Sequence, residues 1–196
     1  MRLLPALALV LSVAGGTAAH AAETVPADRF LDALRPLCGQ AFQGRIAVNE
    51  PANPDDPFNG KTLVMHVRGC EAGRIAIPFH VGEDRSRTWV LSRTETGLRL
   101  KHDHRHADGS EDELTQYGGD TTAPGSAERQ EFPADAFSKD LFTRTGRTVS
   151  VPNVWAMAVE PGKSFTYELA RPGRLFRVEF DLTTPVPAPP APWGHE

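Results

Sequence analysis

The stretch that decides the fold runs from Leu98 to Gly109 and reads LRLKHDHRHADG. Successive side chains of a β-strand point to opposite faces of the sheet. Read with that period of two, one face of the stretch is charged, with Arg99, Lys101, Asp103 and Arg105. The other face carries Leu98, Leu100, His102, His104 and His106. The alternation predicts a strand whose leucines and histidines point inward.

The same alternation recurs on both sides of this stretch. It is found in residues 42–48, 62–68, 74–81, 87–93, 163–169 and 174–182, and residues 153–159 form a nearly continuous apolar run. Hairpin-sized turns such as Asp108-Gly109 join these segments, which indicates an antiparallel meander of about eight to ten strands. Because closure removes exposed sheet edges, we expect an up-and-down β-barrel, with a two-sheet β-sandwich as the alternative. Apolar residues at helical spacing in 27–38 predict a short N-terminal helix.

The two ends of the chain are expected to lie outside the barrel domain. An apolar run from Leu3 to Val13, followed by Ala19-His20-Ala21, matches a secretory signal peptide over residues 1–21. The sequence therefore predicts export to the periplasm or the cell exterior, with cleavage near Ala21. The apolar run is too short for a spanning helix, and no later stretch is apolar enough to be one. Residues 22–182 are expected to form one domain, and the proline-rich residues 183–196 a flexible tail.

Composition restricts the redox chemistry and the partners. The chain contains two cysteines, Cys38 and Cys70. In an oxidising compartment such a pair predicts a disulfide, with free thiols or a thiolate metal ligand as alternatives. The net charge is −4 and no basic patch is interleaved with aromatic residues, so nucleic acid is not an expected partner. The oligomeric state stays open.

The histidine strand is the main candidate for function. His102 and His104 are two residues apart, so their backbones lie about 6.6–7 Å apart on one face, and both imidazoles can reach one divalent metal. His66 is the candidate for a third ligand from another strand. Alternatively, His102, His104 and His106 anchor a polar ligand, with Trp89 and Tyr117 as further contacts. The third reading is that these histidines are half-exposed residues near a barrel rim, and that Trp89 is core.

Catalytic signatures are missing, so an enzyme is not the favoured reading. The sequence contains neither G-x-S-x-G nor H-E-x-x-H, and nothing assembles a catalytic set. The charged turn at residues 82–87 is typical of a solvated hairpin, although Arg85 and Arg87 are an alternative pair for an anion at a pocket mouth. Residues 117–120 are expected to form a flexible loop, and the alternative is that Gly118-Gly119 permits a tight approach of the backbone to another group.

A short N-terminal helix, a glycine-containing first strand and a meander together resemble the calycin group. This group includes lipocalins, fatty-acid-binding proteins and small haem-binding barrels. The lipocalin Gly-x-Trp signature is absent, and residues 39–44 read GQAFQG. The resemblance implies a barrel interior that holds a small, often apolar molecule. The leading hypothesis is thus an exported small-molecule-binding barrel with a histidine-lined interior. A metal-binding protein or metal-dependent enzyme, and a structural envelope-associated domain without ligand, are the alternatives.

Overall fold

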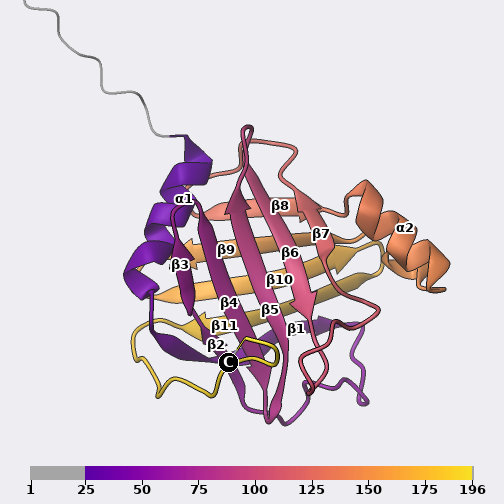
Figure 1. Cartoon of the computed structure of the whole chain (residues 1–196), viewed down its shortest axis with the longest axis horizontal. Helices are drawn as coiled ribbons and strands as arrows, with labels where there is room; N and C mark the ends of the chain where they lie inside the picture. The colour runs from indigo at the N-terminus through magenta and orange to yellow at the C-terminus, as the bar shows by residue number, and fades with distance from the viewer. Residues whose placement is uncertain (1–24, 196) are drawn as a thin grey trace, which may run out of the picture.

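The chain folds into a nearly closed antiparallel β-barrel. The computed structural model describes residues 25–195, so the expected signal peptide lies outside the described residues and stays a prediction. The strands of this part follow the order β7-β6-β5-β4-β2-β1-β11-β10-β9-β8, and β3 pairs with β4 (Figure 1). Most neighbours in the barrel are neighbours in the sequence, as in a meander. The prediction of a barrel is confirmed.

The elements have the following bounds. The strands are β1 (Ala41–Glu50), β2 (Leu63–His66), β3 (Gly69–Glu71), β4 (Arg74–Val81), β5 (Asp84–Arg93), β6 (Leu98–His104), β7 (Tyr117–Asp120), β8 (Arg129–Pro133), β9 (Val154–Glu160), β10 (Ser164–Arg171) and β11 (Arg174–Asp181). The helices are α1 (Pro26–Leu34), η1 (Arg35–Leu37), α2 (Ala136–Arg144) and η2 (Thr148–Ser150). In the described part, no helix has the length and apolar character needed to cross a membrane.

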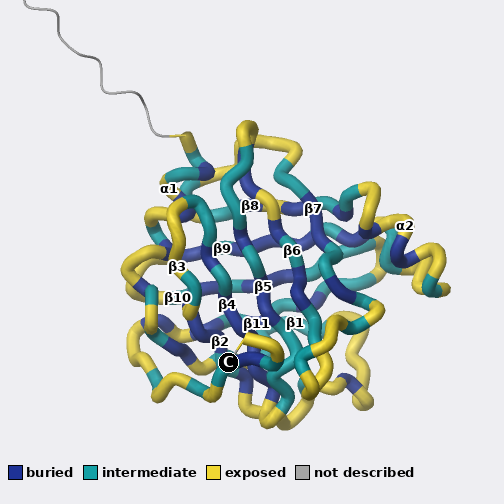
Figure 2. Tube along the Cα trace, in the orientation of Figure 1, coloured by how far each residue is buried: buried dark blue, intermediate teal, exposed yellow. Residues whose placement is uncertain are grey.

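The alternating strands place one apolar face inside the barrel. In β6, Leu98, Leu100 and His102 are buried, whereas Arg99 between them is exposed. The steep strands β4 to β6 lie in front of the flatter strands β8 to β11, and buried positions recur along both sets (Figure 2). The inward side chains of the two sets meet in one hydrophobic core.

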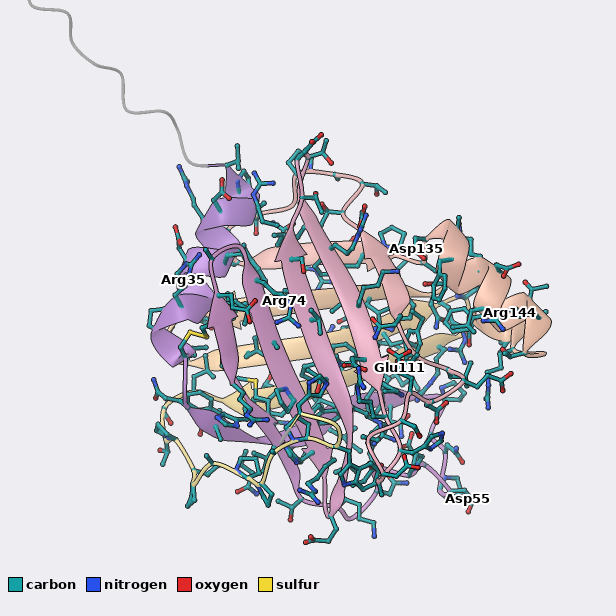
Figure 3. The ribbon with its side chains drawn as sticks, in the orientation of Figure 1. Arg35, Asp55, Arg74, Glu111, Asp135 and Arg144 are labelled. Carbon is teal, nitrogen blue, oxygen red and sulfur yellow. A yellow bond between two sulfur atoms is a disulfide. The ribbon has the colours of Figure 1, made fainter. Side chains whose placement is uncertain are left out.

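The helix α1 covers one side of the barrel and is tied to it covalently. It buries Phe30, Leu31 and Leu34 because these residues share one helix face. Directly after η1, Cys38 forms a disulfide with Cys70 on β3, close to α1 (Figure 3). The predicted disulfide is confirmed.

Removing this disulfide by the double substitution Cys38→Ala and Cys70→Ala is expected to lower the free energy of unfolding by about 3 kcal/mol. The cysteines are 32 residues apart, and a cross-link over such a loop restricts the unfolded chain. Urea unfolding of the oxidised and the substituted protein measures the difference. The wild type under reducing conditions is the control, and it should match the double variant. Equal stability of the oxidised and substituted proteins would contradict this account.

The seam between β7 and β8 is closed by backbone that only glycine allows. The Asp135 amide donates to the Gly118 carbonyl over 2.9 Å, and the Ser138 hydroxyl donates to the same carbonyl over 2.8 Å. A Cβ atom on Gly119 would lie 1.8 Å from the Pro133 carbonyl oxygen. The flexible loop expected at residues 117–120 is instead the strand β7, and the alternative, a close approach at Gly118-Gly119, is present and joins the two end strands of the sheet.

The substitution Gly119→Ala is expected to destabilise the protein by about 2–3 kcal/mol, because the new methyl group pushes β8 away from the seam. Gly162→Ala is the matched control. Its Cβ would meet nothing within 4 Å, so only its positive φ of 72° opposes alanine, at a cost of about 1 kcal/mol. Thermal unfolding of both variants measures the two losses. Equal losses would show that the seam is not tightly packed.

Residues 183–195, named the strap here, lie against the outside of the barrel. The Val186 amide donates to the Ala41 carbonyl over 2.8 Å, and the Trp193 amide donates to the Arg85 carbonyl over 3.2 Å. At the end of the strap, His195 Nε2 lies 2.8 Å from an Asp103 carboxylate oxygen. The strap thus crosses the front of the sheet near β2, β4 and β5, where the chain end is marked in Figure 1. This is the segment expected from the sequence as a tail.

Candidate functional site

The interior of the barrel is filled by a column of rings. Phe79 stacks on Trp89 with centroids 4.8 Å apart, and Trp89 stacks on Tyr167 at 4.3 Å. His102 meets Tyr167 edge-on and stacks on Tyr117 at 4.5 Å. Trp89 is only 1% exposed and Phe79 only 2%. Trp89 therefore packs in the core, and side chains fill the middle of the barrel.

His102 is held inside this column with both ring nitrogens engaged. The Tyr117 carbonyl can only accept, so His102 Nδ1 donates to it over 3.1 Å. His102 Nε2 then accepts from the Tyr167 hydroxyl over 2.7 Å. Burial, followed by the nearby His104, lowers the pKa of His102 to about 3. His102 is thus neutral at pH 7 and has no free nitrogen for a metal or ligand.

His104 lies one step closer to the end of the barrel and borders a hollow. Its Nε2 is 3.3 Å from the Tyr117 hydroxyl. Burial, and after it the charge of Arg87, lowers the pKa of His104 to about 4, so this ring is also neutral at pH 7. Burial raises the pKa of the Tyr117 hydroxyl, which keeps its proton. Together they offer neutral hydrogen-bonding groups at the barrel mouth.

The hollow at this end, named the mouth pocket here, has a volume of about 200 Å³. The ends of β6, β9 and β10 meet the region of α2 and η2 there. The pocket is lined by His104, Leu114, Tyr117, Phe142, Arg147, Ser150, Asn153, Trp155, Leu169 and Arg171. The rings of Tyr117 and Trp155 are tilted by 32° with centroids 5.6 Å apart. The pocket has aromatic and aliphatic walls with a few polar groups, as is usual for small-molecule sites.

The mouth pocket has two guanidinium groups that lack a carboxylate partner in the described part of the chain. Arg147 and Arg171 line it, and neither makes an ion pair with a carboxylate among residues 25–195. Arg171 donates to the Asn153 side-chain carbonyl over 3.2 Å. The buried indole nitrogen of Trp155 has no hydrogen-bond partner in the described chain, and it is closed off from the pocket surface. The two guanidinium groups are the charged donors that an acceptor in this pocket would meet.

The other predicted histidines lie elsewhere. His66 is on β2 between the inward-facing Met65 and Val67, so it faces outward, on the opposite side of the sheet from His102 and His104. His106 follows β6 on an exposed loop, 4.0 Å from the Asp112 carboxylate. The predicted metal set of His102, His104 and His66 is therefore not brought together. Within the part of the chain that is described, no three His, Cys, Asp or Glu side chains converge on a common point.

Arg85 and Arg87, the alternative anion pair of the turn at residues 82–87, are both engaged within the protein. Arg87 pairs with Asp84, and Arg85 donates to the Ala191 carbonyl of the strap. The arginines at the mouth are Arg147, before η2, and Arg171, at the end of β10. The sequence indicates only weakly that Arg171 points inward, because this residue continues the alternation of Phe165, Tyr167 and Leu169 by one step. Arg147 is brought to the pocket by the turn after α2, which no period reveals.

Comparison of the chain with protein-family models, with curated proteins and with solved structures finds no match.

Proposed function

We propose that this chain is an exported binding protein that takes a small organic anion in the mouth pocket. The observation that carries the proposal is the pair Arg147 and Arg171, two guanidinium groups without a carboxylate partner in a pocket walled by aromatic rings. Guanidinium forks bind carboxylates with short, charge-assisted hydrogen bonds. Export, and kinship with calycin-like barrels, are part of the proposal. The disulfide is compatible with an oxidising compartment.

The size and walls of the pocket define the class of ligand. A pocket of about 200 Å³ is smaller than most drug-sized sites, so it suits a ligand with one ring or a short chain. Phe142, Trp155 and Leu169 provide apolar contacts for its body. His104 is neutral at pH 7 because its pKa is lowered to about 4, so the positive charge comes from the arginines alone. This arrangement favours a monocarboxylate over a neutral or cationic molecule of the same shape.

Matched acids and amides test the proposal. Isothermal titration of the protein with phenylacetate and phenylacetamide, and with hexanoate and hexanamide, compares ligands that differ only in charge. Each acid is expected to bind at least about tenfold more tightly than its amide. Arg171→Gln should remove most of this preference, whereas Arg171→Lys should keep part of it. Arg144→Gln is the control, because Arg144 pairs with Asp140 on α2 and does not line the pocket (Figure 3).

A blocking substitution locates the site. Ser150→Trp fills the mouth pocket, whereas Thr148→Trp adds the same bulk at an exposed residue that does not line it. Binding should be lost in the first variant and kept in the second. If acids and amides bind equally well, and Ser150→Trp abolishes the binding of both, the mouth pocket is the binding site but it does not prefer anions. If no member of either pair binds, the binding function is refuted and a structural envelope-associated domain is left.

A further inference from the structure

A second feature lies on the opposite side of the barrel wall, where the strap covers two histidines. His66 on β2 and His80 on β4 both alternate with inward-facing residues, so both point outward. They are nevertheless only 9% and 3% exposed. The register pairs Val64 with His80 and Met65 with Phe79, which puts His66 next to Pro78 and diagonal to His80.

The strap runs across this outward face. Pro192 of the strap lines a pocket together with Pro78 on β4 and Arg68. Arg85 donates to the Ala191 carbonyl over 3.0 Å, and Arg68 donates to the His195 carbonyl over 2.6 Å. These anchors place the strap across the region where the two histidines lie.

The two histidines are poorly supplied with partners in this covered position. His66 Nδ1 and His80 Nε2 are buried without a hydrogen-bond partner in the described chain. The strap is rich in proline between residues 185 and 192, and proline carries no amide donor. Arg68 and Arg85, which anchor the strap, are cations beside the two rings. A proton on either ring would therefore be a buried charge among like charges.

We propose that the strap is a pH-sensitive cover, which is docked at neutral pH and detaches when His66 and His80 take up protons. In the detached state both rings face water on the outer surface of β2 and β4, where their charge is solvated. The detached strap exposes its proline-rich residues and the outer surface beneath Pro192. The device is independent of the mouth pocket, which opens on the inner side of β6.

The charged groups around the pair set the direction of the effect. Burial, and after it the charge of Arg68, lowers the pKa of His66, and a backbone hydrogen bond at Gly39 opposes them. Burial, His66 and Arg85 lower the pKa of His80 to about 4, and Asp84 opposes them. Protons therefore bind the detached state more tightly, and the detached population rises as the pH falls from 7.5 to 5.

One contact at the end of the strap acts against release. His195 contacts the Asp103 carboxylate, and Asp103 also forms an ion pair with Arg105. His195→Gln removes the opposing contact, so it should move release to higher pH.

Hydrogen exchange of the full mature chain tests the proposal. The Val186 and Trp193 amides report on docking, because they donate to Ala41 and Arg85. Their protection factors, corrected for the intrinsic rate at each pH, should fall at least about tenfold between pH 7.5 and pH 5. The double variant His66→Gln and His80→Gln should lose this fall, whereas His106→Gln, at an exposed loop residue, should behave as the wild type.

A second variant keeps the test decisive if the double variant folds poorly. Asp103→Asn weakens the end contact without touching the buried pair, so it should lower protection at both pH values and keep the fall between them. Protection that is independent of pH in the wild type would overturn the proposal. So would an equal fall in the double variant, since release would then not depend on His66 and His80.

Discussion

Replacing Trp89 by alanine is expected to lower the free energy of unfolding by about 4–5 kcal/mol, more than the other substitutions considered. Trp89 lies at the centre of the ring column, between Phe79 and Tyr167, and is 1% exposed. Deleting a buried indole loses its transfer free energy and leaves a cavity that rigid strands cannot fill. Urea unfolding measures the loss. Trp193→Ala, in the strap, is the matched control and should cost about 1 kcal/mol.

The same variant tests whether the interior is filled. An apolar cavity in a rigid core stays dry and binds aromatic molecules of matching size. Indole at millimolar concentration should therefore raise the melting temperature of Trp89→Ala, because it binds the folded state only. The wild type should gain less, because it can hold indole only in the mouth pocket. An equal gain in both proteins would show that the deletion opens no new site.

The barrel could be predicted from the sequence because the alternation in each strand shows which of its faces is apolar. Leu98 and Leu100, or Phe176, Val178 and Phe180, repeat every second residue, and all five are buried. The meander then follows from short turns. A close approach at the seam glycines was only the alternative to a flexible loop, because their partner, the Pro133 carbonyl, depends on how far the sheet curls before its ends meet.

The candidate site was only partly predictable. His104 and Tyr117 were named from the alternation, and both line the mouth pocket. Arg147 and Arg171 are separated by 24 positions, and they reach one pocket through the turn after α2 and the pairing of β9 with β10. His66 differs, because the alternation of its own strand already placed its side chain on the other face of the sheet from Leu63 and Met65. The alternation was therefore enough to predict that His66 and His102 lie on opposite faces of the sheet. They were grouped only because the metal hypothesis needed a third ligand.

The filled column also changes what the histidine strand does. Leu98 and Leu100 begin a gradient from apolar core to open mouth, and His102 lies at its closed side, with both nitrogens bonded within the protein. His104 lies at the open side, next to the pocket. His102 therefore packs in the core, and His104 borders the mouth pocket.

Acid is expected to destabilise the barrel strongly, through the histidines buried in it. The pKa of His102 is lowered to about 3 and that of His104 to about 4, both mainly by burial. In the unfolded chain both titrate near the ordinary value of about 6.5. The unfolded state therefore takes up protons first as the pH falls below about 6.5, and the stability present above that pH is progressively lost. By pH 4 the loss from the two residues is on the order of 5 kcal/mol.

The slope of stability against pH identifies the residue responsible. Each proton taken up only by the unfolded state lowers the free energy of unfolding by about 1.4 kcal/mol per pH unit. His102→Gln cannot titrate, so its slope between pH 6 and pH 4 should be shallower than that of the wild type by this amount. His106→Gln, on an exposed loop, should keep the wild-type slope. Urea unfolding at several pH values measures all three proteins. An unchanged slope in His102→Gln would mean that the fully buried ring is charged in the folded barrel, and the ring column would then need a counter-ion that its hydrogen bonds to Tyr117 and Tyr167 do not provide.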